Sequence, residues 1–444
     1  MASGYSAKRF EENRGNRKLC RLNPFEFFDH TGCISTVFSL RISYDDYRCL
    51  LGSSFYERMG IPMLLTNIRL SLRGWRAASC QCGMLVALTL FVLGCAGPPI
   101  IGGGAGKVKP PPDANKYNGV VHVFYATDRK IDPGAGKPEY TAERSDNETL
   151  SLGTLDVSIP RDHKMGEIER PSIWRFEFSE DPEKHVVLLG VSPKPESVFF
   201  KELSQVVSTS AHNQAFVFVH GYDVTFADAA MRTAQLAYDL GFEGAPILYS
   251  WPSKGQVQDY PADEASIEWA APHLKNFLEK IAANSNATTV HLIAHSMGNR
   301  ALTKALSSIA EERPEFPHIF KQVFLAAPDI DAGVFKQLAE SFPKAASQVT
   351  LYASSNDKAL LASKKFHDFP RAGDTATFVT VVPRVDTIDA TAVDTGFLGH
   401  SYYGDNRSIL SDIFVVIRTG DPPSKRFGMK PNQPMNPTYW MFRP

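Results

Sequence analysis

Cysteine is absent from most of this chain. All six cysteines lie in the first 95 of the 444 residues, and the last of them is Cys95. The following 349 residues therefore hold no disulfide scaffold, cysteine-ligated zinc site, iron–sulfur cluster or thiol nucleophile. An excess of one charge is also missing, because 47 Lys and Arg are balanced by 48 Asp and Glu. This balance argues against a nucleic-acid partner.

The rest of the composition is that of an ordinary globular protein. Hydrophobic residues make up 43% and charged residues 21% of the chain. The part that follows Cys95 is long enough to bury a sizeable core, as one large domain or two modest ones. The triple glycine Gly102–Gly104 lacks the Lys-Ser/Thr of a phosphate-binding loop. We expect no cofactor and no metal.

Long hydrophobic runs are also lacking. The most apolar stretch, Met84–Leu93, has ten residues. As a helix it would span about 15 Å, half of a bilayer core, so a transmembrane helix is disfavoured. Three basic residues precede it, Arg69, Arg73 and Arg76. With no acidic residue between Met63 and Cys95, residues 63–95 have the pattern of a secretory signal peptide.

The end of this signal, Val92-Leu93-Gly94-Cys95, resembles a bacterial lipobox. That resemblance implies that Cys95 is lipidated and becomes the mature N-terminus. It implies a protein anchored by lipid to the cell envelope, at the periplasmic face of the outer membrane. Two alternatives stay open: a buried helix that ends in Gly-Cys, and a soluble cytoplasmic protein in which the lipobox is accidental.

Two further segments flank the signal. Residues 1–62 show no clear periodicity, and we interpret them as a non-native or disordered extension from a start codon assigned too early; the alternative is a genuine cytoplasmic extension. Residues 96–117 hold five glycines and five prolines in 22 positions. That composition predicts a linker between the anchor and a folded domain.

Residues 118–420 alternate between short β-rich runs and helical segments. The predicted strands are Val120–Tyr125, Leu152–Ile159, Val186–Val191, Ala215–Val219, Pro246–Ser250, Thr289–Ala294, Val323–Ala326, Val349–Ala353 and Thr377–Val382. The predicted helices are Phe226–Leu240, Glu264–Ala283, Asn299–Glu312, Val334–Ser341, Lys358–Phe366 and Ser408–Ile417. This alternation predicts an α/β fold with a mostly parallel central sheet, helices on both faces and an antiparallel N-terminal edge. Residues 421–444, rich in proline, are expected to form an extended tail attached through Trp440 and Phe442.

A candidate nucleophile lies where one buried strand meets a helix. The run Ala294-His295-Ser296-Met297-Gly298 is an A-x-S-x-G form of the nucleophile elbow. The flanking Ala294 and Gly298 are small enough for the tight turn. This turn should expose the Ser296 hydroxyl above the sheet at a helix N-terminus, where developing negative charge is favoured. A serine that only caps the helix is the structural alternative.

A serine nucleophile needs a base oriented by an acid, in the chain order serine, acid, histidine. Three histidines follow Ser296, namely His318, His367 and His400. Only His400 follows the last predicted strand and precedes the final helix, which is the position expected of the base. The acid usually follows the strand two after the elbow, which selects Asp357. Its competitors are Asp329, Asp331, Asp386, Asp389 and Asp394. Of these, Asp331 is the main rival and is equally suited to cap the next helix.

The oxyanion of an acyl-transfer reaction requires backbone N–H donors. One should come from Met297, directly after the nucleophile. The other should come from Tyr222, because Gly221 in the loop after an earlier strand allows close backbone approach. Trp251, in the segment SWPSKG, is expected either to line the substrate pocket or to pack in the core.

Six segments in order, HGYDVTF, SWPSKG, AHSMGNR, LAAPDID, SSNDKAL and GHSYY, resemble a family of bacterial α/β-hydrolases known as domain of unknown function 900. The resemblance covers residues 119–420 and implies the α/β-hydrolase fold, with Ser296, Asp357 and His400 as nucleophile, acid and base. The family loop usually carries asparagine where this chain has Asp223. A carboxylate beside the oxyanion site implies weaker anion stabilisation or a different substrate preference.

These patterns together predict a serine hydrolase tethered to the cell envelope. Its substrate is expected to be a small-molecule or lipid acyl ester, cleaved through an acyl-enzyme. Esters are favoured over amides only by their frequency in the superfamily. The alternative hypothesis is a non-catalytic envelope lipoprotein that uses the same fold as a binding module.

Overall fold

The fold is taken from a computed structural model of the chain. The structure describes residues 119–132, 134, 139–146, 149–172, 177–313, 319–393, 407–432 and 438–443. The predicted signal, Cys95, the linker and His400 lie outside these residues. Within them, no helix is both long and apolar enough to cross a membrane.

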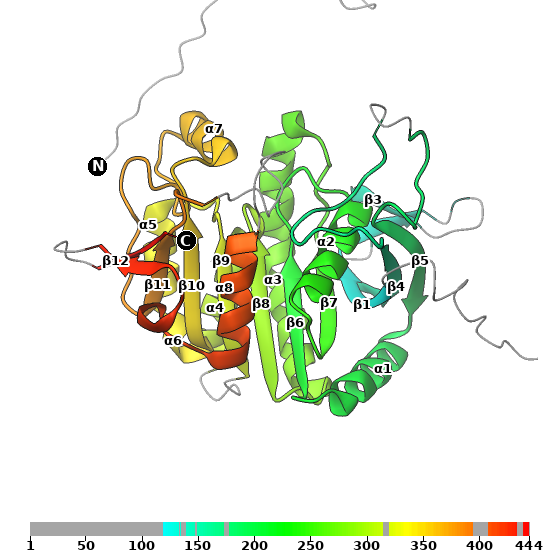
Figure 1. Cartoon of the computed structure of the whole chain (residues 1–444). Coiled ribbons are helices and arrows are strands. Elements are labelled where there is room, and N and C mark those ends of the chain that lie inside the picture. The colour runs from blue at the N-terminus through cyan, green and yellow to red at the C-terminus, as the bar shows by residue number, and fades with distance from the viewer. Residues whose placement is uncertain are drawn as a thin grey trace, which may run out of the picture. The chain divides into compact units, whose positions relative to one another are not determined.

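The described part is built on a sheet of eleven strands (Figure 1). In order across the sheet they are β12 (Met429–Pro431), β13 (Trp440–Phe442), β11 (Val385–Asp389), β10 (Ala346–Ala353), β9 (Phe320–Ala326), β8 (Thr289–His295), β6 (Gln214–Val219), β7 (Ala245–Ser250), β1 (Gly119–Thr127), β4 (Ser151–Ile159) and β5 (Val187–Lys194). A separate hairpin pairs β2 (Arg129–Asp132) with β3 (Glu139–Arg144).

Strand direction agrees with the sequence prediction. The central strands from β11 to β1 pair in parallel, whereas β1, β4 and β5 pair antiparallel at the edge. The mostly parallel sheet with an antiparallel N-terminal edge is therefore confirmed. Every residue of β6 is buried, as expected for a continuous apolar strand covered on both faces.

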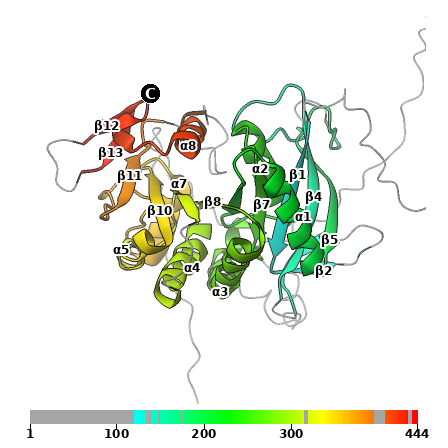
Figure 2. The same ribbon diagram turned by 90° about the horizontal axis from the view of Figure 1, so that it is seen from below.

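Helices cover both faces of the sheet. They are α1 (Glu196–Thr209), α2 (Phe226–Asp239), α3 (Tyr260–Asn284), α4 (Gly298–Glu312), α5 (Ala332–Ala339), α6 (Phe342–Ala345), α7 (Lys358–His367) and α8 (Arg407–Thr419), with short 3₁₀ turns η4 (Val257–Asp259) and η6 (Pro423–Lys425). Figure 2 shows α2 and α8 on one face and α3, α4 and α5 on the other. Each face has its own apolar core: α2 and α8 contribute to one, and α1, α3, α4 and α5 contribute to the other.

Two segments differ from the prediction. Thr377–Val382 is not a strand; the strand of this region is β11, which begins at Val385 after Pro383. The β-branched composition of 377–382 suits an extended loop equally well, and the Thr380 carbonyl accepts a hydrogen bond from the Thr387 hydroxyl (2.9 Å). The C-terminal segment is more than a tail, because β13 pairs with β11 and β12 pairs with β13. The sheet therefore extends past the predicted boundary at residue 420.

Two buried histidines have opposite electrostatic environments. His163 lies between Glu169 (Nδ1–Oε2, 2.9 Å) and Asp239 (Nε2–Oδ1, 2.9 Å). Burial alone would lower the pKa of His163, but hydrogen bonds to Asp239 and Glu169 raise it to about 9. His291, on β8, is 1% exposed, and neither ring nitrogen has a hydrogen-bond partner. Burial, with Lys321 nearby, lowers the pKa of His291 to about 4, so this ring is neutral at neutral pH.

Candidate active site

The structure places Ser296 on the turn between β8 and α4, as the elbow motif predicts. Its backbone φ is +49°, a conformation that non-glycine residues adopt rarely. The Ser296 N–H donates to the Ala326 carbonyl of β9 (3.0 Å), which attaches the turn to the sheet. A Cβ at Gly298 would lie 2.4 Å from the His220 carbonyl oxygen, so only glycine fits there. The sharp strand–turn–helix geometry of a nucleophile elbow is therefore present.

The structure does not show the expected exposure of the Ser296 side chain. Ser296 is 1% exposed, and Met297 beside it is fully buried. The loop after β6 packs closely here: a Cβ at Gly221 would lie 3.0 Å from the Ser296 Cβ and 2.9 Å from His295 Nδ1. Glycine at this position allows the loop backbone to pack directly against the serine. The two segments that sequence analysis assigned to the nucleophile and to the oxyanion site are thus in contact.

The loop after β6 contains both Tyr222 and Asp223. Asp223 has φ +58°, in the left-handed region where asparagine and aspartate are the most tolerated side chains after glycine. This backbone requirement explains why either asparagine or aspartate fits at position 223. The Asp223 N–H donates to Asp263 on α3 (3.3 Å). The Tyr222 ring packs edge-on against Tyr260 (5.2 Å between centroids), and burial, with Asp223 nearby, raises the pKa of the Tyr222 phenol.

His220, at the start of this loop, is a structural residue. Its Nδ1 donates to the Gly221 carbonyl (2.8 Å), and its Nε2 lies 3.2 Å from the Ser250 hydroxyl. Burial, together with the nearby Arg129, lowers the pKa of His220 to about 3. A ring that stays neutral and has both nitrogens in hydrogen bonds is not a general base at neutral pH.

Of the two roles expected for Trp251, the structure shows packing in the core. It is fully buried, and its ring stacks on His220 with an interplanar angle of 11° and 5.1 Å between centroids. Its Nε1 donates to the His220 carbonyl (2.8 Å). The indole therefore supports the loop after β6. A tryptophan directly after β7 suits core packing and pocket lining equally well, so the sequence could not distinguish the two roles.

Both candidate acids cap helices. Asp357 follows β10, is 4% exposed, and its Oδ1 accepts from the N–H groups of Ala359 and Leu360 (3.0 Å each). Asp331 follows β9, and its Oδ1 accepts from the Val334 N–H (2.9 Å). A carboxylate has about four acceptor positions, so capping is compatible with a second role for either residue.

Asp329, another candidate from the sequence, is held in a buried network. Its Oδ1 accepts from Arg371 Nε (2.8 Å), its Oδ2 accepts from the Tyr260 hydroxyl, and Arg300 lies 3.8 Å away. Burial alone would raise the pKa of Asp329, but Arg300 and Arg371 lower it. The Asp329 N–H donates to the Ser296 carbonyl (3.2 Å). Its carboxylate is already bonded to Tyr260, Ser363 and Arg371, which leaves it poorly suited to orient a histidine.

The predicted base cannot be placed, because His400 lies outside the described residues; its assignment stays a prediction. The position of His367 in the sequence disfavoured it as the base, and its ring nitrogens contact other residues. Its Nε2 lies 2.7 Å from Glu264 Oε1, and its Nδ1 donates to the Ser363 carbonyl (2.8 Å).

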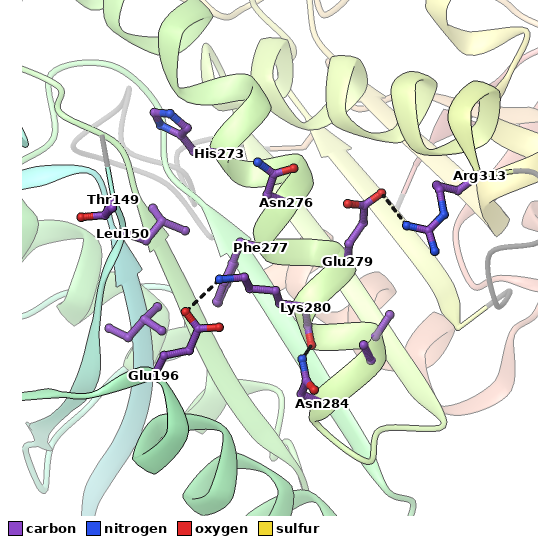
Figure 3. A pocket seen from close by; sticks show the side chains of 13 residues that line it. Thr149, Leu150, Glu196, His273, Asn276, Phe277, Glu279, Lys280, Asn284 and Arg313 are labelled. Carbon is purple, nitrogen blue, oxygen red and sulfur yellow. Dashed lines mark hydrogen bonds and ion pairs between the residues drawn. The ribbon is translucent and has the colours of Figure 1, made fainter. Parts of the chain in front are cut away.

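A cavity of about 710 Å³ lies apart from this site (Figure 3). Residues of α3 line one side, Leu150 and Leu152 line the other, and an ion pair between Lys280 and Glu196 (2.8 Å) crosses it. Ser296 is not among its lining residues. Across the described ranges, no group of three or more His, Cys, Asp or Glu side chains is placed to hold a metal ion.

The strand order, the elbow and the loop that packs against it define an α/β hydrolase. Comparison with known families makes the assignment more specific: the model described as "Alpha/beta hydrolase of unknown function (DUF900)" matches residues 196–418, half of the chain. The chain belongs to this family, which confirms the resemblance inferred from its motifs.

Individual relatives are more distant. The uncharacterized protein alr1448 of Nostoc sp. (strain PCC 7120) is 33% identical over 66 residues, which are 15% of this chain and only 17% of that relative. A dienelactone hydrolase from Anabaena variabilis is 12% identical, with a TM-score of 0.30, and the match covers 66% of this chain and 98% of the other. An esterase from Pyrobaculum calidifontis is 13% identical, with a TM-score of 0.29, 68% of this chain and 86% of the other being covered. The fold assignment therefore rests on the sheet topology and the family match.

Proposed function

We propose that this α/β hydrolase cleaves an acyl ester with Ser296 as the nucleophile. One observation supports the proposal most directly. Ser296 holds a left-handed backbone conformation on a strand–helix turn, with the Gly221 backbone packed against it. Strain of this kind persists only where the surrounding structure maintains it, and it is concentrated at functional sites.

In the proposed mechanism, Ser296 Oγ attacks the acyl carbonyl while His400 accepts its proton. The N–H groups of Met297 and Tyr222 stabilise the tetrahedral oxyanion. His400 then returns the proton to the leaving alcohol, which departs and leaves an acyl-enzyme. Water, activated by the same histidine, releases the carboxylic acid and restores the serine. Asp357 orients the imidazole and stabilises its charged form.

A panel of p-nitrophenyl esters with graded acyl chains tests this proposal on the full chain. We expect hydrolysis by the wild type and a loss of at least about 10³-fold in Ser296→Ala. Ser307→Ala is a matched control, because Ser307 is a buried serine of α4, the helix that follows the Ser296 turn, and is bonded to Glu311 (3.2 Å). Hydrolysis unaffected by Ser296→Ala would refute the mechanism. No hydrolysis of any ester, with a folded wild type, would favour the binding-module alternative.

We also propose that Cys95 carries the lipid that tethers the enzyme to the cell envelope. The lipobox-like sequence, the preceding arginines and the Gly/Pro-rich segment after it support this. Growth with radiolabelled palmitate should label the wild type and the Cys49→Ala control but not Cys95→Ala. Equal labelling of all three, or no labelling with the protein in the cytoplasm, would contradict the anchor.

A further inference from the structure

A charged side chain is buried beneath the loop that carries Tyr222. Arg129, the first residue of β2, is 1% exposed. Its Nη2 donates to the Val224 carbonyl (2.8 Å), its Nη1 to the Ser253 carbonyl (2.9 Å) and its Nε to the Ser250 hydroxyl (2.9 Å). Arginine is seldom fully buried, because its charge must be compensated by hydrogen bonds. Here those bonds join the loop after β6 to the loop after β7.

A second buried charge holds the same two loops. Asp263 on α3 is fully buried. Its Oδ2 accepts from the Ser253 hydroxyl (2.6 Å) and from the Asp223 N–H (3.3 Å), and its Oδ1 accepts from the Lys254 N–H (2.8 Å). The Ser253 hydroxyl in turn accepts from the Val224 N–H (3.1 Å).

These bonds fix the backbone on both sides of Tyr222. Before it, the Gly221 carbonyl accepts from His220 Nδ1 (2.8 Å). After it, the Asp223 N–H is bound by Asp263, and the Val224 carbonyl is bound by Arg129. The Tyr222 N–H belongs to the same planar peptide group as the Gly221 carbonyl, and the residues after it are held by a clamp formed by Arg129 and Asp263. Together these bonds restrict the direction of the Tyr222 N–H. A preorganised donor of this kind does not have to reorient as the oxyanion forms.

We infer that Arg129 and Asp263 are positioning residues, which aim the Tyr222 N–H at the oxyanion without touching the substrate. The inference rests on the proposed hydrolase function and extends it to two residues outside every sequence motif. Because the clamp acts on a donor that matters most in the transition state, its loss should lower kcat and leave KM nearly unchanged.

Steady-state kinetics of the full chain with a hydrolysed p-nitrophenyl ester test this inference. We expect Arg129→Ala to lower kcat by about 100-fold, with KM within about threefold of wild type. Arg129→Lys should restore little, because an ammonium group cannot reproduce the planar fork of donors. Added guanidinium chloride at low millimolar concentration should restore part of kcat in Arg129→Ala but none in Ser296→Ala.

Arg426→Ala is the matched control. Arg426 has a fully buried guanidinium that bonds to Asp412 (3.4 Å), Asp386 (3.3 Å) and Thr350 (3.3 Å), in a part of the sheet away from the loop after β6. Its loss should lower Tm as much as the loss of Arg129 but leave kcat per folded molecule within about threefold. Equal kcat losses in the two variants would show a general effect of destabilisation and overturn the inference.

The outcomes separate the two proposals. A wild type without Ser296-dependent turnover would overturn the hydrolase function and this inference with it. Normal turnover in the wild type and in folded Arg129→Ala would overturn the inference alone. If Arg129→Ala does not fold, Asp263→Asn, which keeps the shape of the side chain, decides: a kcat reduced at least about tenfold supports the clamp, and an unchanged kcat refutes it.

Discussion

The packing of the elbow makes a specific prediction for Gly298→Ala. The new Cβ would lie 2.4 Å from the His220 carbonyl oxygen and 2.8 Å from that of Val219. Ordinary contacts are about 3.5 Å, so roughly 1 Å of overlap must be relieved. Both oxygens belong to the backbone and cannot rotate away. Either the start of α4 or the loop after β6 must move.

The expected magnitudes follow from this overlap. Overpacking of this kind lowers the free energy of unfolding by about 3 kcal/mol, at the upper end of the usual range. A loss of this size lowers Tm by about 6 °C in a domain of this size. A displacement of about 1 Å at the nucleophile or the oxyanion donor should reduce kcat by about 100-fold. Calorimetry gives the first quantity and ester hydrolysis the second.

Gly190→Ala on β5 is the control, because no atom lies within 4 Å of its added Cβ. Its Tm should change by no more than about 1 °C and its kcat should be that of wild type. A Gly298→Ala variant with the same Tm and kcat as Gly190→Ala would refute the strand–turn–helix packing at Ser296.

Three further predictions concern single side chains. Asp357→Asn should lower kcat by about 10⁴-fold, whereas Asp331→Asn should leave it nearly unchanged; the reverse result in the ester assay would move the acid to Asp331. The pKa of His163 is raised from an ordinary 6.5 to about 9, so its contribution to stability is complete below pH 6.5 and lost as pH rises through 9. Urea titrations should show that the free energy of unfolding falls by about 3 kcal/mol over this window and that His163→Gln abolishes the fall. An equal fall in the variant would contradict the assignment. The pKa of His291 is lowered to about 4, so stability should fall as pH drops from 6.5 through 4. His291→Leu should reduce this acid loss and raise stability at pH 7 by about 1 kcal/mol, and a less stable variant would show that the ring nitrogens are hydrogen-bonded in solution.

The strands of the central sheet could be predicted because their apolar runs are continuous. β6 and β8 were located within one residue, since a strand buried on both faces tolerates few polar residues. Helix α1 was missed although Phe199, Leu203 and Val207 repeat every four residues and are all buried. The hairpin β2–β3 was missed because its strands are short and largely exposed.

The candidate active site was predictable only where the backbone imposes a local pattern. Ser296 and Gly221 stand in motifs because a tight turn and a close approach restrict the residue type. Arg129 and Asp263 stand in none, since their role depends on the fold bringing β2, α3 and two loops together. The burial of Trp251 and Ser296 also depends on the fold bringing distant segments together, so it could not be predicted from the sequence.

Covalent labelling tests whether Ser296 is an activated nucleophile. The full chain would be treated with a fluorophosphonate, digested, and analysed by mass spectrometry. We expect one phosphonyl adduct, on the peptide that contains Ser296, and none in Ser296→Ala. A folded wild type with no adduct, or an adduct on another residue that persists in Ser296→Ala, would show that Ser296 is not the nucleophile.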